Sequence, residues 1–398
     1  MKIVENYNLK IGLLFLAIFI DLLGFGIIIP ILPFYATELG ANSVVYGMLI
    51  AIYSLMQFIF SPIWGSVSDR IGRRPVILIG LTGSIFGYAM FGISFDLFTL
   101  FFSRVLSGIA TSATLTVANA YVADITEPQK RGGVFGILTA AFGLGFAIGP
   151  AIGGILSKYS FFGFHGIATP GFFAATLSLI NLLGAYFVLS ESLPEELRMK
   201  ENESRSLFVI SGITKLKNYP NAIKFITLFS IVTLGFTNLI AAFALYAPII
   251  DSSIDEAKLG VLYSYVGLIL FFSQYLFVKP IIERYGERIV IRIGTILAFI
   301  GFFSIPFATS YTMYFVAVTP LMIGFSGMNP SFNSLLSNSV PNKMQGEVLG
   351  INQGFAALMR TIGPVFAGGL MLIVPAMPFF VGGLFFLGLA MYSFLYLK

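Results

Sequence analysis

Long apolar segments dominate the sequence and restrict its fold more than any other feature. Twelve mostly apolar runs, each about 20 residues or longer, follow one another and are separated by polar connections. A run of this length crosses the hydrocarbon core of a bilayer as a helix. Because backbone polar groups find no water there, spanning segments are helices or closed barrels. The sequence therefore predicts an all-α integral membrane protein with twelve transmembrane helices.

The predicted spans fall into two groups of six. One long polar segment, residues 191–221, follows the sixth span, and within it Ser206–Ile213 is expected to form a short surface helix. We therefore predict an N-terminal six-helix bundle at 1–190, a cytoplasmic central loop at 191–221 and a C-terminal six-helix bundle at 222–398. The spans are 11–35, 44–64, 75–94, 98–122, 132–157, 168–190, 222–248, 257–280, 288–308, 311–337, 346–370 and 374–397.

Composition supports a membrane location and excludes several kinds of chemistry. The 398 residues are 57% hydrophobic and only 10% charged, whereas a soluble domain carries about 25% charged residues. The sequence has no cysteine and one histidine, so we expect no metal site. It contains no phosphate-binding G-x-x-x-x-G-K-[ST] loop and no catalytic set of side chains. We expect no cofactor and no nucleic-acid partner, with a membrane enzyme or sensor as a remote alternative.

The distribution of Lys and Arg predicts the orientation. If the N-terminus is cytoplasmic, the cytoplasmic segments hold 19 of these residues and the outer loops hold only Lys158 and Lys258. Cytoplasmic loops of membrane proteins carry the excess of Lys and Arg. We therefore expect a multi-pass protein of the cell membrane with both termini in the cytoplasm.

The two halves of the chain repeat each other at a constant offset. Asp69–Arg74 recurs 214 residues later as Glu283–Arg288, and Gly149-Pro150 recurs at the same offset as Gly363-Pro364. Repeats of this kind are typical of secondary transporters, in which the substrate binds near mid-membrane at the repeat interface. The offset predicts two pseudo-symmetric bundles.

The connection between the second and third predicted spans concentrates glycines, arginines and one carboxylate. Glycines permit a tight turn, a carboxylate accepts from N–H groups at a helix N-terminus, and guanidinium groups bind carboxylates. A plain positive-inside anchor needs the arginines but not this order of residues. The residues are Gly65, Asp69, Arg70, Gly72, Arg73 and Arg74. Their order resembles the G-x-x-x-D-R-x-G-R-R signature of the major facilitator superfamily.

The fifth span carries a second pattern. It consists of Gly145, Gly149, Pro150, Gly153 and Gly154. Small residues every four positions indicate close helix packing. Their order is similar to the G-x-x-x-G-P-x-x-G-G motif of drug:proton antiporters in the same superfamily, and Tyr53–Phe58 and Ala120–Ile125 resemble the tetracycline:proton antiporters. The resemblance implies a twelve-helix exporter driven by the proton gradient.

Two ionisable residues fall inside predicted spans. Asp21 lies near the middle of the first span, where a carboxylate costs about 2.5–3.5 kcal/mol on insertion scales. We expect it to face a cavity and exchange a proton, or else to be satisfied by neighbouring helices. Arg104 lies in the fourth span, where a guanidinium needs a partner, water or access to the membrane surface. The resemblance implies that Asp21 is the helix-one acid of the tetracycline antiporters and that Arg104 serves in proton relay or binding.

The chain departs from the tetracycline antiporters in one respect. Those proteins carry intramembrane aspartates in helices three and nine, whereas residues 75–90 and 289–307 contain none. This difference argues against tetracycline with its metal ion as the substrate. Proton coupling would then rest on Asp21, with Arg104 tuning it.

Further polar residues are predicted to build an inner gate and a cavity. Asp124 is expected to pair with Arg73, in a contact that closes the gate and breaks when it opens. Glu283 and Arg284 are expected to act in the same way in the second half. The cavity candidates are Gln57, Asn119, Asn238, Asn329, Asn333 and Gln353, each of which alternatively makes a packing hydrogen bond, together with Tyr53 and Phe236.

These patterns favour a monomeric secondary transporter that exports small amphipathic compounds by alternating access in exchange for protons. Multidrug or tetracycline-like efflux is the expected activity. The main alternative is an uptake carrier or facilitator for a nutrient or metabolite. Dependence of efflux on an imposed pH gradient separates the two.

Overall fold

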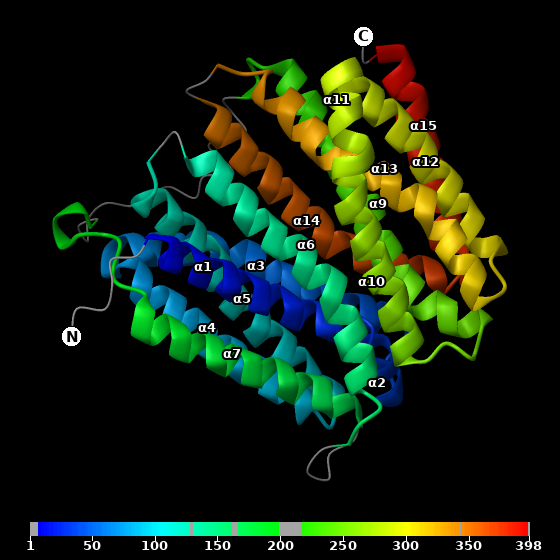
Figure 1. Ribbon diagram of the computed structural model, residues 1–398. Coiled ribbons are helices and arrows are strands. Elements are labelled where there is room, and N and C mark those ends of the chain that lie inside the picture. The colour runs from blue at the N-terminus through cyan, green and yellow to red at the C-terminus, as the bar shows by residue number, and fades with distance from the viewer. Residues whose placement is uncertain (1–6, 128–129, 161–165, 199–215, 342–343, 397–398) are drawn as a thin grey trace. The chain divides into compact units, whose positions relative to one another are not determined.

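The computed structural model describes residues 7–127, 130–160, 166–198, 216–341 and 344–396 (Figure 1). This part of the chain consists of helices and turns, with no β-strand. Eleven of its helices are long and apolar enough to cross a membrane. The remaining predicted span, 132–157, corresponds to the helix Arg131–Leu156. The all-α membrane fold is therefore confirmed, while the predicted surface helix Ser206–Ile213 lies outside the described residues.

The helices of the first half are α1 (Tyr7–Ile28), α2 (Leu32–Glu38), α3 (Ser43–Ile71), α4 (Arg73–Gly92), α5 (Leu97–Ile125), α6 (Arg131–Leu156), the 3₁₀ turn η1 (Gly166–Ala168) and α7 (Thr169–Val188). After the 3₁₀ turn η2 (Glu195–Leu197) come α9 (Pro220–Ile250), α10 (Glu256–Ser273), the π-helical turn η3 (Gln274–Val278), α11 (Lys279–Tyr285), α12 (Glu287–Ser304), the 3₁₀ turn η4 (Ile305–Phe307), α13 (Tyr311–Ser337), α14 (Gln345–Met371) and α15 (Met377–Tyr396).

Two observed helices differ from their predicted spans. The first span is interrupted after Ile28 and resumes as α2, because Pro30 and Pro33 lack the N–H groups that a continuous helix requires. The second span was expected to end before Gly65, but α3 continues to Ile71. Most of the expected polar connection is therefore helical, and only Gly72 separates α3 from α4.

The chain divides into two compact units. The first comprises residues 1–40, 52–205 and 256–264, and the second comprises 41–51, 206–255 and 265–398. Within the first unit, α1 packs against α6 and α7, and α4 packs against α5 and α7 (Figure 1). Within the second unit, α9 packs against α14 and α15, and α12 packs against α13 and α15.

The repeat predicted from the sequence is visible in the backbone. Gly72 precedes α4 with φ 103° and ψ 163°, and Gly286, its counterpart 214 residues later, precedes α12 with φ 81° and ψ 169°. Residues with a Cβ rarely adopt this conformation. The two halves therefore make the same one-residue reversal between helices at corresponding positions.

Candidate functional site

Asp21 lies in the interior of the first unit. It is fully buried on α1, and its carboxylate oxygens have no hydrogen-bond partner among the described residues. The hydroxyl groups of Ser84 on α4 and Thr114 on α5 lie beside the carboxyl group without reaching hydrogen-bond geometry. Because an isolated charge inside a membrane protein is expensive, this position suits a carboxyl group that holds a proton or meets water.

Tyr88 holds α1 against α4 at this point. Its hydroxyl group donates a hydrogen bond of 3.0 Å to the backbone carbonyl of Asp21. Gly24, one turn further along α1, makes room for the ring, since a Cβ there would lie 2.6 Å from Tyr88 Cζ. Tyr88 was not among the predicted residues, because nothing in a single sequence pairs a tyrosine of one helix with a glycine of another.

The glycines of α6 support α1 from another side. Gly145, Gly149 and Gly153 lie against the backbone of α1 between Leu22 and Ile27. A Cβ at Gly149 would lie 2.7 Å from the carbonyl oxygen of Leu23. This agrees with the packing interpretation of the fifth-span motif, and the close approach fixes α1, which carries Asp21.

The other two residues of the motif lie against α10. A Cβ on Gly260 would collide with the carbonyl oxygen of Pro150, and one on Gly154 with that of Glu256. The backbone N–H of Ala151 donates to the hydroxyl of Ser264, with N and Oγ 2.9 Å apart. The motif therefore has two contact faces: its glycines at 145, 149 and 153 face α1, and Pro150 with Gly154 faces the first residues of α10.

Arg104 is buried in the same unit as Asp21. Its side chain is on α5, it is only 2% exposed, and its guanidinium carbon lies 4.5 Å from the centre of the Tyr53 ring on α3. Tyr53 also stacks on Phe25 of α1, with ring centres 5.0 Å apart. A cation over an aromatic face is stabilised by the ring electrons, more strongly when both are desolvated. Arg104 therefore does not reach the membrane surface, and it packs inside the unit.

These side chains form one polar cluster. The hydroxyl groups of Tyr53 and Tyr88 each lie near enough to both Asp21 and Arg104 to interact with their charges. We call the set of Asp21, Tyr53, Ser84, Tyr88, Arg104 and Thr114 the Asp21 cluster. It brings together the predicted acid, the predicted arginine and one predicted cavity residue, and it adds three residues that the sequence analysis missed.

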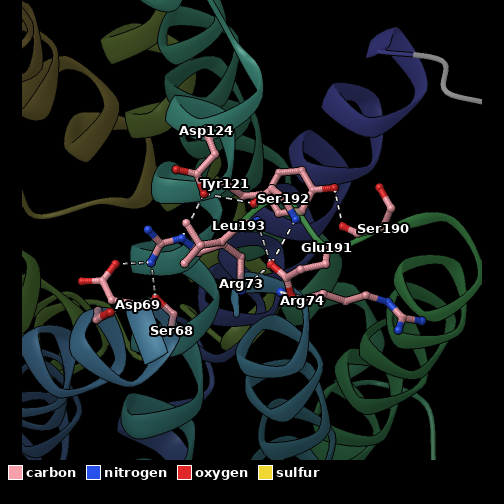
Figure 2. Close-up of polar contacts among 11 residues, drawn as sticks. Ser68, Asp69, Arg73, Arg74, Tyr121, Asp124, Ser190, Glu191, Ser192 and Leu193 are labelled. Carbon is pink, nitrogen blue, oxygen red and sulfur yellow. Dashed lines mark hydrogen bonds and ion pairs between the residues drawn. The ribbon is translucent and has the colours of Figure 1, made fainter. Parts of the chain in front are cut away.

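The end of α3 and the start of α4 form a second polar site (Figure 2). Arg73 is 8% exposed and binds Asp124 on α5, with Nε and Oδ2 3.0 Å apart. Its Nη1 donates to Ser68 Oγ at 2.7 Å and pairs with Asp69. The expected ion pair between Arg73 and Asp124 is present, and Arg73 connects two carboxylates within the first unit.

Glu191 completes this network and was missed by the sequence analysis. Figure 2 shows its carboxylate at the N-terminus of α4, where Oε1 accepts from the backbone N–H of Arg73 at 2.8 Å and Oε2 from that of Arg74 at 3.2 Å. The same carboxylate accepts from the N–H groups of Ser192 and Leu193, both at 3.0 Å. A carboxylate at a helix N-terminus satisfies N–H groups that have no partner within the helix.

The residues on either side of Glu191 are anchored as well. Tyr121 donates to the carbonyl of Ser190 at 2.7 Å, and the hydroxyl of Ser192 donates to Asp124 at 3.0 Å (Figure 2). The segment that follows α7 is thus bound to the ends of α4 and α5. We call Ser68, Asp69, Arg73, Asp124 and Glu191 the helix-end network.

The side chains of the remaining predicted gate residues take no part in the ion pairs that Arg73 forms in this network. Gly65 is half-buried on α3, Arg70 is exposed, and Arg74 donates to the carbonyl of Tyr186 at 2.7 Å. In the second unit, Glu283 is exposed and lies 4.0 Å from Lys279, and Arg284 is also exposed. Glu287 stands 214 residues after Arg73, so the repeat preserves the glycine turn but not the buried arginine.

The predicted cavity residues of the second unit have varied surroundings. Asn238 is buried and donates to the carbonyl of Pro378 at 3.0 Å, which is a packing hydrogen bond. Asn333 donates to Asn329 at 2.7 Å and accepts from Asn352 at 3.0 Å. Asn352 is fully buried and was not among the predicted residues.

The other cavity candidates are less enclosed. Asn119 and Gln353 are exposed, and Gln57 is half-buried. Asn119 donates to the carbonyl of Leu115 in its own helix. Phe236 packs edge-on against Phe325, with ring centres 5.0 Å apart.

A helical membrane fold with duplicated halves and a buried acid and arginine defines the class of secondary transporters. Residues 14–364 match the model of the Major Facilitator Superfamily, and the chain belongs to this superfamily. It is therefore a multi-pass membrane transporter and not an enzyme. Transporters of this type need no cofactor and use an ion gradient.

Two bacterial relatives cover most of the chain. The tetracycline resistance protein, class C, of Escherichia coli is 31% identical over 87% of this chain and 85% of its own length. Multidrug resistance protein 2 of Bacillus subtilis is 30% identical over 92% of this chain and 90% of its own length. Among solved structures, a bacterial homologue of the human lysosomal transporter Spinster shares the fold with a TM-score of 0.80 at 13% identity, over 98% of this chain and 97% of that one.

Proposed function

We propose that this transporter exports small amphipathic compounds in exchange for protons and that Asp21 carries the proton. The burial of Asp21 without a hydrogen-bond partner among the described residues supports this role most strongly. A structural carboxylate would be paired, whereas a carrier has to change its charge during each cycle. The export direction rests on relatives named for tetracycline and multidrug resistance.

The Asp21 cluster suits such a proton exchange. Arg104 keeps its charge at all relevant pH values and provides an electrostatic counterpart when Asp21 releases its proton. The hydroxyls of Ser84 and Thr114 are beside the carboxyl group and accept or donate according to its protonation state. A cationic or amphipathic substrate then competes with the proton for the same negative charge.

The substrate range is proposed to be that of a multidrug exporter. Residues 75–90 and 289–307 contain no aspartate. Asp69, which is also buried on a spanning helix, is paired with Arg73, so we assign the coupling to Asp21. One acid and aromatic surroundings such as Tyr53 and Phe25 suit lipophilic cations. The absence of these intramembrane aspartates, which the tetracycline antiporters carry, argues against metal-bound tetracycline as the substrate.

The helix-end network is proposed to act as a conformational latch. Arg73 bridges carboxylates from α3 and α5 at the ends of three helices, and breaking such buried pairs changes the balance between two conformations. Alternating access, cytoplasmic termini and function as a monomer belong to the same proposal, with six-helix bundles at 1–190 and 222–398 joined by the loop at 191–221.

The test uses the purified chain in liposomes with an imposed pH gradient. Movement of a lipophilic cation such as tetraphenylphosphonium is followed for wild type, Asp21→Asn and the control Asp96→Asn. Asp96 caps α5 from an exposed loop by accepting from the Thr99 N–H, and asparagine keeps that acceptor.

We expect gradient-driven transport in wild type and Asp96→Asn and its loss in Asp21→Asn. If transport by the wild-type protein does not depend on the pH gradient, the protein is a facilitator and not an antiporter. Gradient-driven transport that survives in Asp21→Asn would show that another group carries the proton.

A further inference from the structure

A groove in the second unit is not accounted for by transport chemistry. It lies between α9 and α15 and has a volume of about 600 Å³. Its walls are mostly apolar. The wall residues are Leu228, Ile231, Leu234, Leu384 and Phe385.

One end of the groove is polar. Lys224, in the second turn of α9, and Tyr392, close to the end of α15, lie there together with Thr227. The ammonium of Lys224 donates to the carbonyl of Tyr396 at 3.0 Å and lies 5.2 Å from the centre of the Tyr392 ring. An ammonium group has three N–H donors, so donors remain for an anion.

The length of the groove matches one leaflet of a bilayer. Residues 224–234 of α9 line it, and ten residues of helix rise about 15 Å. This is about half of the hydrocarbon thickness of about 30 Å. Tyrosine and lysine are typical of the membrane–water interface. The groove thus runs from the interface to about the bilayer centre.

We propose that this groove binds an anionic phospholipid. The phosphate contacts Lys224 at the interface, and one acyl chain lies along the apolar walls of α9 and α15. Charge complementarity selects an anionic headgroup over a zwitterionic one, because a lysine near the surface attracts anionic lipid. The positive-inside count predicts that this end faces the cytoplasm, where anionic lipids concentrate. The site is separate from the Asp21 cluster, which belongs to the first unit.

Gly388 provides a way to fill the groove. It is exposed on α15 and lines the groove, and a Cβ added there meets no atom within 4 Å. The backbone here therefore has room for a side chain to begin, and a leucine side chain is expected to occupy the space proposed for the acyl chain. Gly369 on α14 offers a matched control, because a Cβ there also meets nothing and the residue does not line the groove.

The experiment measures lipid retention by the full chain in detergent, using native mass spectrometry. The probes are phosphatidylglycerol, phosphatidylcholine and inorganic phosphate. We expect wild type to retain phosphatidylglycerol in preference to phosphatidylcholine. Lys224→Gln should weaken phosphatidylglycerol binding about fivefold, the effect of one lysine near an anionic surface. Gly388→Leu should abolish retention at this site. Gly369→Leu should match wild type, and so should Lys217→Gln, because Lys217 is an exposed residue before α9 that does not line the groove.

Three results would overturn the proposal. Equal retention of the two lipids by wild type would remove the selectivity for an anionic headgroup. Unchanged phosphatidylglycerol binding in both Lys224→Gln and Gly388→Leu would show that Lys224 serves only the end of α15. Binding of inorganic phosphate that depends on Lys224 without lipid retention would define a free-anion site.

Discussion

At the scale of single residues, Gly72 and Glu191 depend on each other. Gly72 has a positive φ of 103°, and the Glu191 carboxylate occupies the space where a side chain at residue 72 would begin. Gly286 has a similar backbone conformation, but a Cβ there meets no atom within 4 Å. A substitution at Gly286 therefore introduces backbone strain alone, whereas one at Gly72 introduces the same strain together with a collision with Glu191.

We expect Gly72→Ala to destabilise the protein more than Gly286→Ala. Both substitutions carry backbone strain of about 1–3 kcal/mol, and only the first also displaces Glu191. Thermal unfolding midpoints of the two variants in detergent provide the measurement. Equal midpoints would show that the Glu191 side chain can move aside at no cost in stability.

Glu191 itself is predicted to stabilise the start of α4. Glu191→Ala removes the acceptor of four backbone N–H groups and should lower the free energy of unfolding by about 1–3 kcal/mol. Glu195→Ala is the control, since its side chain is 84% exposed. Thermal unfolding in detergent measures both, and a midpoint of Glu191→Ala equal to that of the control would contradict the capping role.

At the scale of helices, the contact between α1 and α6 determines where Asp21 lies. The α6 glycines approach the α1 backbone too closely for any side chain. Overpacking at such a contact costs about 1–3 kcal/mol or more, because backbone cannot move aside as a flexible side chain does. The position of the proposed proton carrier thus depends on glycines in another helix.

Gly153→Ala should therefore separate α1 from α6 and lower both stability and gradient-driven transport. Its Cβ would collide with the carbonyl of Ile27. Gly12→Ala on α1 is the matched control, because its Cβ meets nothing within 4 Å, and alanine favours a helix by up to about 1 kcal/mol over glycine. Thermal unfolding and liposome transport test the pair, and equal behaviour of the two variants would rule out the close contact.

Much of the helical arrangement was predictable from the sequence, and the reasons are physical. Apolar runs and glycine spacing depend on local periodicity, so the spans, the repeat and the α6 packing motif followed from them. The missed residues Tyr88, Glu191 and Asn352 act through partners far along the chain. Glu191, for example, contacts Arg73 across 118 positions. Such pairs depend on how helices dock, which residue types alone do not determine.

At the scale of the whole molecule, the charge distribution predicts which ends of the helices face the cytoplasm. The chain has no cysteine, so a single introduced cysteine is the only labelling site. Tyr159, between α6 and η1, and Asn218, before α9, are both exposed. In intact cells, a membrane-impermeant maleimide should label Tyr159→Cys but reach Asn218→Cys only after permeabilisation. The reverse pattern would invert the predicted orientation.

The central claim is that substrate and proton compete through Asp21. The most direct measurement adds tetraphenylphosphonium to purified protein in weakly buffered detergent near neutral pH and follows proton release with a pH indicator. Because linked binding equilibria are reciprocal, wild type and Asp96→Asn should release about one proton per molecule and Asp21→Asn none. Release from Asp21→Asn equal to that from wild type would contradict the account.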